Sequence, residues 1–311
     1  MQKSSGATIM PGYNYLVFDD VRVSEFNAMS NPYIIGAPSP TSYVGLGYAF
    51  QRYLCGKERF SPNFSLPISI RGTCVIIKSC DIDEGRPLYP AQFNVRSDKN
   101  AAMTGNAPPM VEEVKGHGRL AIIFAFSFDP DTDIEDIEDS FDELGSDKTR
   151  NDMMRFRISG GTIYSVSHPQ CVEDDNEFLS VLSRIPGSAL IDRADLLQPE
   201  EEDERDHLDR LLDALAFQQH KTSNHVINKR QQPGWIVPYA AGYKALEQPK
   251  SRQYAVKNKQ HAYVEPLLGL GEYVTTKRLA ADREKALSAF WRYQHTGSIY
   301  NVRPLLQDAS F

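Results

Sequence analysis

The sequence has few cysteines and no long apolar run, and both shortages limit what the chain can be. Only four of its 311 residues are cysteines, and no two of them form a C-x-x-C pair. This excludes a dense disulfide framework and the common zinc-ribbon patterns. No apolar run approaches the roughly 20 residues of a membrane-spanning helix, and no signal peptide is recognisable. We therefore expect a reduced, cytoplasmic protein without a membrane segment, with Cys74 in its core.

Motifs for catalysis and for metal binding are also missing. The sequence contains no P-loop and no G-x-S-x-G motif, and its seven histidines lack the spacing of zinc ligands. Residues 129–140 superficially resemble a calcium-binding loop, but Ile134 stands where that loop requires glycine and Ser140 where it usually has glutamate. The glycine pairs at 45–47 and 269–271 are not dinucleotide fingerprints and predict close backbone packing. We expect no cofactor, no metal and no catalytic residue.

One histidine keeps an enzymatic alternative open. His117 is flanked by Gly116 and Gly118, and histidine is the most common general base. Some RNA-cutting proteins with RRM-like folds use a histidine in this way. Because no second acid-base partner can be assigned, a metal-independent RNA endonuclease remains the alternative and a non-enzymatic chain the main prediction.

The charge of the chain is distributed unevenly along its length. The whole chain has 34 basic and 41 acidic residues and a net charge of −7, which argues against a general DNA-coating protein. Residues 1–150 carry 14 basic and 20 acidic residues, and residues 151–232 carry 9 and 15. Residues 233–311 carry 11 and 6, so this part alone is net positive.

Basic residues alternate with aromatic and amide residues between positions 229 and 259, where Glu247 is the sole acid. Cations neutralise phosphates and rings stack on bases, so the pattern predicts a site for single-stranded nucleic acid. A solvated basic loop after a buried Trp235 explains the pattern equally well. Four further cations lie beside predicted strands or turns. Together with residues 229–259 on one face of the protein they would form a phosphate groove, whereas each alone could equally form an ordinary surface salt bridge. They are Arg71, Arg155, Arg157 and Arg278.

Hydrophobic periodicity predicts an α+β fold. Strands are expected at 13–24, 66–80, 119–128 and 155–166, and helices at 42–54, 129–147, 176–185, 199–220 and 280–293. Short strands and loops are expected from residue 234 onward. Two rounds of strand, helix and strand with glycine-rich turns predict a ferredoxin-like (RRM-like) core that carries insertions.

This core divides the chain into five parts. Residues 1–80 form its first part, and the Gly-, Pro- and Asn-rich residues 81–118 form an inserted excursion, expected to be a hairpin or thumb. Residues 119–198 complete the core, and 199–232 hold an acidic amphipathic helix and a linker. Residues 233–311 form the basic and aromatic C-terminal part, packed on the core.

Four blocks of sequence together resemble the Csy2 family, the Cas-five-type subunit of type I-F CRISPR surveillance complexes. The resemblance extends from about residue 15 to 294, and the segments 81–118 and 129–147 match only loosely. The blocks are FNAMSNPYIIGAPSPTSYVGLGYAFQRYL at 26–54, SGGTI at 159–163, PGWIVPYAAGYKAL at 233–246, and YVEPLLGLGEYVTTKRL with FWRYQ within 263–294.

The resemblance implies a RAMP-type fold, with an RRM-like core and a protruding thumb, and a role without catalysis. Such subunits hold the 5′ handle of the CRISPR RNA, cap the filament of backbone Cas subunits and pair with a large Cas subunit, while the guide reads the target DNA. In variant systems the chain would instead be a repeated backbone subunit or read the flanking DNA motif. A structural subunit that contacts only protein, through 129–147 and 199–216, also remains possible.

The resemblance also implies roles for particular residues. Asn27, Ser30, Gly36 and Ser39 would lie against the handle, and Gly160 and Gly161 would let RNA or a neighbouring subunit approach closely. Trp235 and Tyr243 would each stack on a base or fill the core, and for Trp235 we expect the core. The expected phosphate contacts are Lys244, Arg252, Lys257 and Lys259, with Arg278 as a further candidate.

Overall fold

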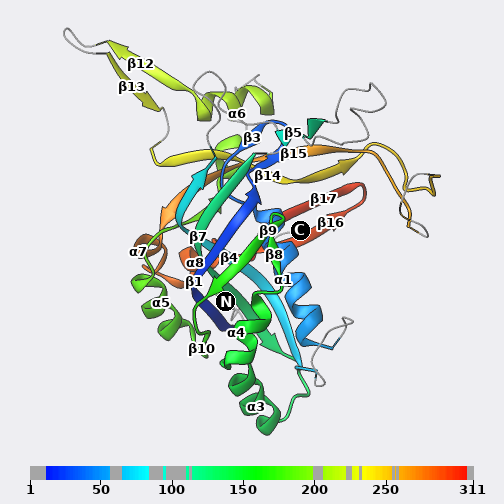
Figure 1. Ribbon diagram of the computed structural model, residues 1–311. Helices are drawn as coiled ribbons and strands as arrows, with labels where there is room; N and C mark the ends of the chain where they lie inside the picture. The colour runs from blue at the N-terminus through cyan, green and yellow to red at the C-terminus, as the bar shows by residue number, and fades with distance from the viewer. Residues whose placement is uncertain are drawn as a thin grey trace, which may run out of the picture.

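Eleven antiparallel strands form the main sheet of the computed structural model, and helices cover both of its faces (Figure 1). The sheet order is β11-β15-β14-β17-β16-β4-β7-β1-β9-β8, with β10 also paired to β1. The structure describes residues 12–56, 65–83, 94–95, 110–111, 114–198, 206–221, 226–230, 233–253, 256 and 259–306.

Four long strands form the centre of the sheet in the order β9-β1-β7-β4. They are β1 (Asn14–Asn27), β4 (Ile68–Ile82), β7 (Lys115–Phe128) and β9 (Gly161–Val166). The continuous apolar run of β7 lies between β4 and β1 and is buried on both faces, as such a run predicts. The strands expected at 13–24, 66–80 and 119–128 are therefore confirmed.

Short strands and turns connect these four strands. The segment expected at 155–166 is a hairpin of β8 (Arg157–Ile158) and β9 with Ser159 and Gly160 at its turn. The other short strands are β2 (Met29–Asn31), β3 (Ile34–Ile35) and β10 (Gln170–Val172).

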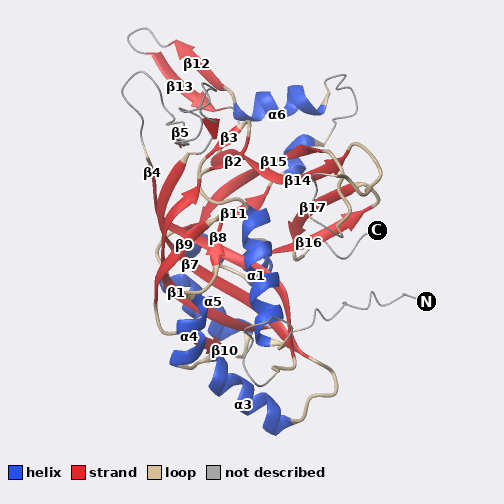
Figure 2. Ribbon diagram, turned by 45° about the vertical axis from the view of Figure 1, so that its right-hand side comes forward, coloured by secondary structure: helices blue, strands red, loops and turns tan. Residues whose placement is uncertain are grey.

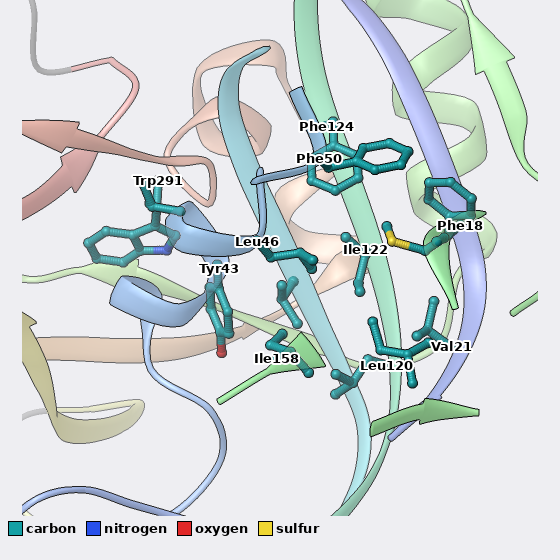
Figure 3. Close-up of a cluster of buried hydrophobic side chains, with 14 of the residues drawn as sticks. Phe18, Val21, Tyr43, Leu46, Phe50, Leu120, Ile122, Phe124, Ile158 and Trp291 are labelled. Carbon is teal, nitrogen blue, oxygen red and sulfur yellow. The ribbon is translucent and has the colours of Figure 1, made fainter. Parts of the chain in front are cut away.

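Helices α1 (Pro40–Leu54), α3 (Ile134–Leu144) and α4 (Asp147–Met153) cover one face of the four strands. Phe50 of α1 packs on Phe124 of β7, with ring centroids 5.3 Å apart, and Phe18 of β1 meets both rings edge-on (Figure 3). Gly47 is needed there, because a Cβ would lie 2.3 Å from the Thr73 hydroxyl oxygen, whereas Gly45 faces open space. Close packing is thus confirmed for one glycine of the pair.

Helices α5 (Asp175–Arg184), α7 (Thr276–Leu279) and α8 (Arg283–Leu287) cover the opposite face. Tyr15 of β1 stacks on Phe178 of α5 at 3.8 Å and donates a hydrogen bond of 2.5 Å to Asp175. Cys74 lies in this core as predicted, and burial raises its pKa to about 12. Because helices cover both faces, the central sheet offers no bare platform of the kind that RRM proteins present to RNA.

The C-terminal strands close a ring with β4. They are β11 (Ser188–Asp192), β14 (Trp235–Ala245), β15 (Val264–Thr275), β16 (Trp291–Thr296) and β17 (Ile299–Pro304). Pairing runs from β4 to β11, β15, β14, β17 and β16, and returns to β4 through Trp291 opposite Thr73. We call this closed path the six-strand ring.

Trp291 connects strands of the six-strand ring through buried contacts. Its indole Nε1 donates a hydrogen bond of 3.1 Å to the backbone oxygen of Leu190 on β11. Its ring centroid lies 5.1 Å from that of Tyr239 on β14, and its side chain is fully buried. One side chain of β16 therefore contacts two other strands of the ring.

Two expectations for the C-terminal part are wrong. The helix expected at 280–293 is only α8, and β16 begins at Trp291. The turn at Gly297 and Ser298 pairs Thr296 with Ile299, so 291–304 forms a hairpin instead. β14 and β15 are also long, at 11 and 12 residues, where short strands were expected.

The amphipathic helix expected at 199–220 is α6 (His207–Leu215). Its C-terminal limit was wrong, because 217–221 form strand β12 (Phe217–Lys221), paired with β13 (Val226–Arg230). Residues 199–205 lie outside the described residues. Leu211 is buried against Ile236, but Leu208 and Leu212 are 57% and 55% exposed. The expected apolar stripe is thus only partly covered.

Three remaining segments complete the architecture. Helix α3 lies within the acidic stretch 129–147, as predicted. Of the excursion 81–118, short strands β5 (Asn94–Val95) and β6 (Met110–Val111) pair with each other, and residues 84–93, 96–109 and 112–113 lie outside the described part. The 3-10 helix η1 (Ala194–Leu197) packs near α6. None of the described helices has the length and apolar character to cross a membrane.

Candidate nucleic-acid interface

A cleft of about 630 Å³ lies where the segment 27–39 meets β14 and the end of β4. Of the predicted site residues, Ser30, Gly36 and Ser39 line it. Gly36 donates a backbone hydrogen bond of 2.9 Å to Ala28, and the prolines on both sides of Ser39 are buried and stiffen the loop. The sequence thus holds this segment against β14 in a fixed shape.

Trp235 lies at the rim of this cleft, so its expected place in the core is wrong. Its side chain is 65% exposed and meets Tyr273 edge-on at 5.9 Å, while the next residue, Ile236, is fully buried. Successive side chains of a strand point to opposite faces, and the apolar neighbours of Trp235 therefore say nothing of its own burial. Tyr33 and Ile35, also exposed, lie beside the cleft.

The cleft is apolar and almost without charge. Its floor includes Leu190, Val237 and Tyr239, and Lys78 is the one charged residue among the described residues that line it. The Lys78 side chain is only 7% exposed and forms an ion pair of 2.6 Å with Asp19. Such a surface suits a planar or apolar group and does not neutralise phosphates.

Two polar side chains, Ser30 and Tyr273, are among the residues that line the cleft. The hydroxyl oxygen of Ser30 is buried and has no hydrogen-bond partner within the described residues. The Tyr273 hydroxyl is a neutral hydrogen-bond donor at physiological pH, and burial raises its pKa further, to about 12. A ligand with hydrogen-bonding edges and an apolar face matches this combination.

The segment 246–263 connects β14 to β15, and its one acidic residue, Glu247, binds several of its other residues. Glu247 accepts a hydrogen bond of 2.8 Å from Lys250 and also binds Arg252, whose guanidinium lies 4.5 Å from the Tyr263 ring centroid. The bonds from Lys250, Arg252 and the Tyr263 backbone lower the pKa of Glu247 to about 2. We call 246–263 the basic arm; Lys259 is exposed on it, and Lys257 lies outside the described residues.

Two predicted residues lie on β14 beside the basic arm. Tyr243 is 43% exposed and opposite Tyr300 of β17. Lys244 Nζ lies 3.8 Å from a carboxylate oxygen of Glu265 on the neighbouring strand. The cleft and the basic arm are thus at the two ends of β14.

A third group of predicted residues meets at the end of β1. The Asn27 amide donates to the Ser159 oxygen at 2.8 Å, and Arg157 donates to the Gly160 oxygen at 3.2 Å. Gly160 has a φ of +76° and open space around it. A Cβ on Gly161 would lie 2.7 Å from the Phe26 backbone. The group that approaches Gly161 closely is therefore Phe26 of the same chain, where RNA or a neighbouring subunit was expected.

The other predicted cations lie apart from the cleft and the basic arm. Arg71 donates to Ser127 at the far end of β4, and Arg155 lies 3.4 Å from Asp152 at the end of α4. Arg278 belongs to α7, on the opposite face of the sheet, 3.9 Å from Glu272. The described cations therefore do not form the one continuous groove that the sequence suggested.

His117, the candidate base, is on β7 and does not line the cleft. Its Nε2 lies 3.4 Å from a carboxylate oxygen of Asp83, and both side chains are half-exposed. The stretch that resembled a calcium loop is helical from Ile134, with Asp133 as its N-cap residue.

Sequence reasoning missed three aromatic residues near the proposed interface: Tyr33, Tyr293 and Tyr300. Tyr293 and Tyr300 belong to the β16–β17 hairpin, whereas the sequence predicted a helix up to residue 293 and no strand after it. A signal for it exists in the sequence, because the two residues Gly297 and Ser298 separate alternating segments and Gly-Ser is a common two-residue hairpin turn.

Comparison with known proteins relates the chain to one family. The family model described as CRISPR-associated protein (Cas_Csy2) matches residues 16–302. The chain is also similar to a protein of Pseudomonas aeruginosa (strain UCBPP-PA14) named "CRISPR-associated protein Csy2". The two are 26% identical over 305 residues, an alignment that covers 86% of this chain and 88% of the relative.

Proposed function

Because this chain belongs to the Csy2 family of CRISPR-associated proteins, we propose that it is a non-catalytic, RNA-binding subunit of a cytoplasmic type I-F CRISPR ribonucleoprotein. In this role it holds the 5′ handle of the CRISPR RNA and caps the backbone filament. The observation that carries the proposal is the extent of the family match. It spans residues 16–302 and so includes the segment 27–39, β14 and the basic arm.

The proposal includes a ferredoxin-like, RAMP-type core. The order β9-β1-β7-β4, with all neighbours antiparallel, is the strand order of a ferredoxin-like sheet. The crossover from β1 to β4 contains α1, and the crossover from β7 to β9 contains α3 and α4 on the same face. The six-strand ring and the helices on the second face are additions to that core.

We assign RNA contact to the rim of the molecule. Helices cover the central sheet, whereas the cleft, with Trp235 at its rim, is open and apolar and fits an unstacked base. The basic arm, with Lys244 beside it, supplies cations for the phosphates. Trp235 and Tyr243 are eight residues apart on β14, about 26 Å at the usual rise of a strand. Several nucleotides of a single strand would span that distance.

Protein partners belong to the same proposal. A backbone Cas subunit and, where the system has one, a large Cas subunit would contact the chain, and the target DNA would be read by the guide. The exposed Leu208 and Leu212 on α6 are apolar surface suited to a protein contact. A repeated backbone role and a role in reading the flanking DNA motif are the alternatives within the family.

RNA binding is tested with the full chain and a labelled repeat-derived RNA over a range of salt concentrations. We expect Lys244→Ala with Lys259→Ala to weaken binding and to reduce the salt slope by about 0.7 for each phosphate that is no longer neutralised. Lys277→Ala with Lys285→Ala, on α7 and α8, is the matched control and should leave both quantities unchanged. Equal effects of the two double variants would refute the assignment.

The absence of catalysis is tested separately. Purified chain is incubated with repeat RNA in the presence of a chelator, and the RNA is then resolved on a denaturing gel. We expect intact RNA. Cleavage at one position that disappears in His117→Ala would establish the endonuclease alternative instead.

A further inference from the structure

Three tyrosines and a histidine form an exposed aromatic cluster on β14, β17 and β16. Tyr243, Tyr293 and Tyr300 are 43%, 53% and 46% exposed. The ring centroids of Tyr293 and Tyr300 are 5.2 Å apart, and those of His295 and Tyr300 are 4.4 Å apart. We call Tyr243, Tyr293, His295 and Tyr300 the aromatic ladder.

The sequence builds this ladder through strand alternation. Trp291, Tyr293 and His295 are two residues apart, so all three point to the same face of β16. Trp291 is buried inside the six-strand ring, and the two residues after it on that face lie beyond the ring's buried part. The β16–β17 hairpin extends from the body beside α1 (Figure 1, Figure 2).

A glycine brings the third strand close enough to complete the ladder. Gly242 has a φ of +148°, and a Cβ there would lie 1.9 Å from the Tyr300 backbone oxygen. Only glycine permits β14 to approach β17 in this way. The next residue, Tyr243, is consequently opposite Tyr300.

The ladder has the properties of a stacking surface for bases. The phenol of Tyr293, with an ordinary pKa of about 10, is uncharged at physiological pH. Partial burial raises this pKa further, with smaller contributions from Tyr300 and Tyr243. Lys244 follows Tyr243 on the same strand, and residues 233–311 carry 11 basic against 6 acidic residues. Aromatic rings in a positive region favour a polyanion with flat, apolar bases over an acidic or purely aliphatic protein surface.

We propose that the aromatic ladder stacks unpaired bases of a single-stranded nucleic acid whose phosphates the basic arm holds. This inference rests on the proposed RNA-binding function and adds a second base-binding position at the opposite end of β14 from the cleft. It also places stacking on strands outside the central β9-β1-β7-β4 sheet.

The test compares ring removal with ring retention in the full chain. We expect Tyr293→Ala with Tyr300→Ala to weaken binding of a labelled single-stranded repeat RNA about tenfold for each base that no longer stacks, with an unchanged salt slope. Tyr293→Phe with Tyr300→Phe keeps the rings and should retain wild-type affinity. Tyr164→Ala on β9, where the tyrosine is 56% exposed, is the control for removal of a surface ring.

Photo-crosslinking identifies the contact directly. RNA that carries 5-iodouridine should crosslink to Tyr243, Tyr293 or Tyr300, and the peptide is found by mass spectrometry. If the wild-type chain binds RNA but the alanine variant binds it equally well and no ladder peptide is crosslinked, the ladder assignment is wrong. If that variant instead fails to assemble with protein subunits, the ladder is a protein contact. If the wild-type chain binds no RNA at all, the proposed function itself fails.

Discussion

At the scale of single residues, the burial of the two tryptophans does not follow from their neighbours in the sequence. Trp235 stands in an apolar segment but is exposed at the cleft, whereas Trp291, between Phe290 and Arg292, is fully buried. Neighbours along a strand point to the other face, so they cannot show which ring is inside. The burial of Trp291 depends on Leu190 and Tyr239, which are distant in the sequence.

Replacing Trp291 should therefore destabilise the fold more than replacing Trp235. We expect Trp291→Ala to lower the free energy of unfolding by about 3–5 kcal/mol, because it leaves a large cavity and an unpaired backbone oxygen. Trp235→Ala should change it by less than about 0.5 kcal/mol, as is usual at the surface. Urea unfolding followed by circular dichroism measures both; similar destabilisation in the two variants would contradict the buried and exposed assignments.

Glu247 is the residue on which the order of the basic arm depends. Its lowered pKa means that its ion pairs are complete above its ordinary pKa and are lost only as the pH falls toward about 2. At pH 8 we expect Glu247→Gln to make trypsin cleave after Lys250 and Arg252 several times faster, since neither side chain then has its carboxylate partner. Glu265→Gln, outside this cluster, should leave those two cleavage rates unchanged.

At the scale of elements, the helices and strands with long, clear patterns were predictable. α1, α3 and α5 and the strands β1, β4 and β7 follow from the periodicity of their own residues. α6 and the β16–β17 hairpin were misjudged for two different reasons. Phe217 continues the apolar spacing of α6 although it begins β12, and the apolar AFW at 289–291 resembles a helix end although Trp291 belongs to a strand.

Replacing the two glycines of α1 by alanine should change the stability of the protein in opposite directions. Gly45→Ala should stabilise the protein by roughly 0.5–1 kcal/mol, because alanine is the better helix former and its Cβ meets open space. Gly47→Ala should destabilise it by about 1–3 kcal/mol despite the same gain, because the added methyl would overlap the Thr73 hydroxyl. Melting temperatures measured side by side decide the point, and a shift of the same sign in both variants would contradict the packing of α1 on β4.

At the scale of the whole molecule, the candidate site was predictable only in part. The segment 27–39 and the block PGWIVPYAAGYKAL at 233–246 were each identified from the sequence, and the structure brings them together at the cleft. The dispersal of Arg71, Arg155 and Arg278 was not predictable, because it depends on which end and which face of the sheet each element occupies. Closure of the six-strand ring likewise depends on pairings between β4 and strands more than 100 residues later.

The basic arm should be separable from the rest of the fold. It connects β14 to β15 at the surface, and few of its described side chains are buried. We expect replacement of 248–260 by a short Gly-Ser turn to leave the melting temperature within about 2 °C of wild type, while RNA co-purification falls sharply. A large drop in melting temperature would show that the arm supports the core, and undiminished RNA recovery would remove it from the interface.

The single residue pair between β16 and β4 has a dynamic consequence. Beyond Trp291 opposite Thr73, the strand pairs of β16 within the described residues are all with β17, which in turn pairs with β14 at three residues. The strand pairing of the hairpin can therefore open locally while the amides of β7 stay protected from exchange. Amide hydrogens at 292–296 would exchange with solvent much faster than those at 120–126. A single-stranded nucleic acid bound across the hairpin would slow that exchange.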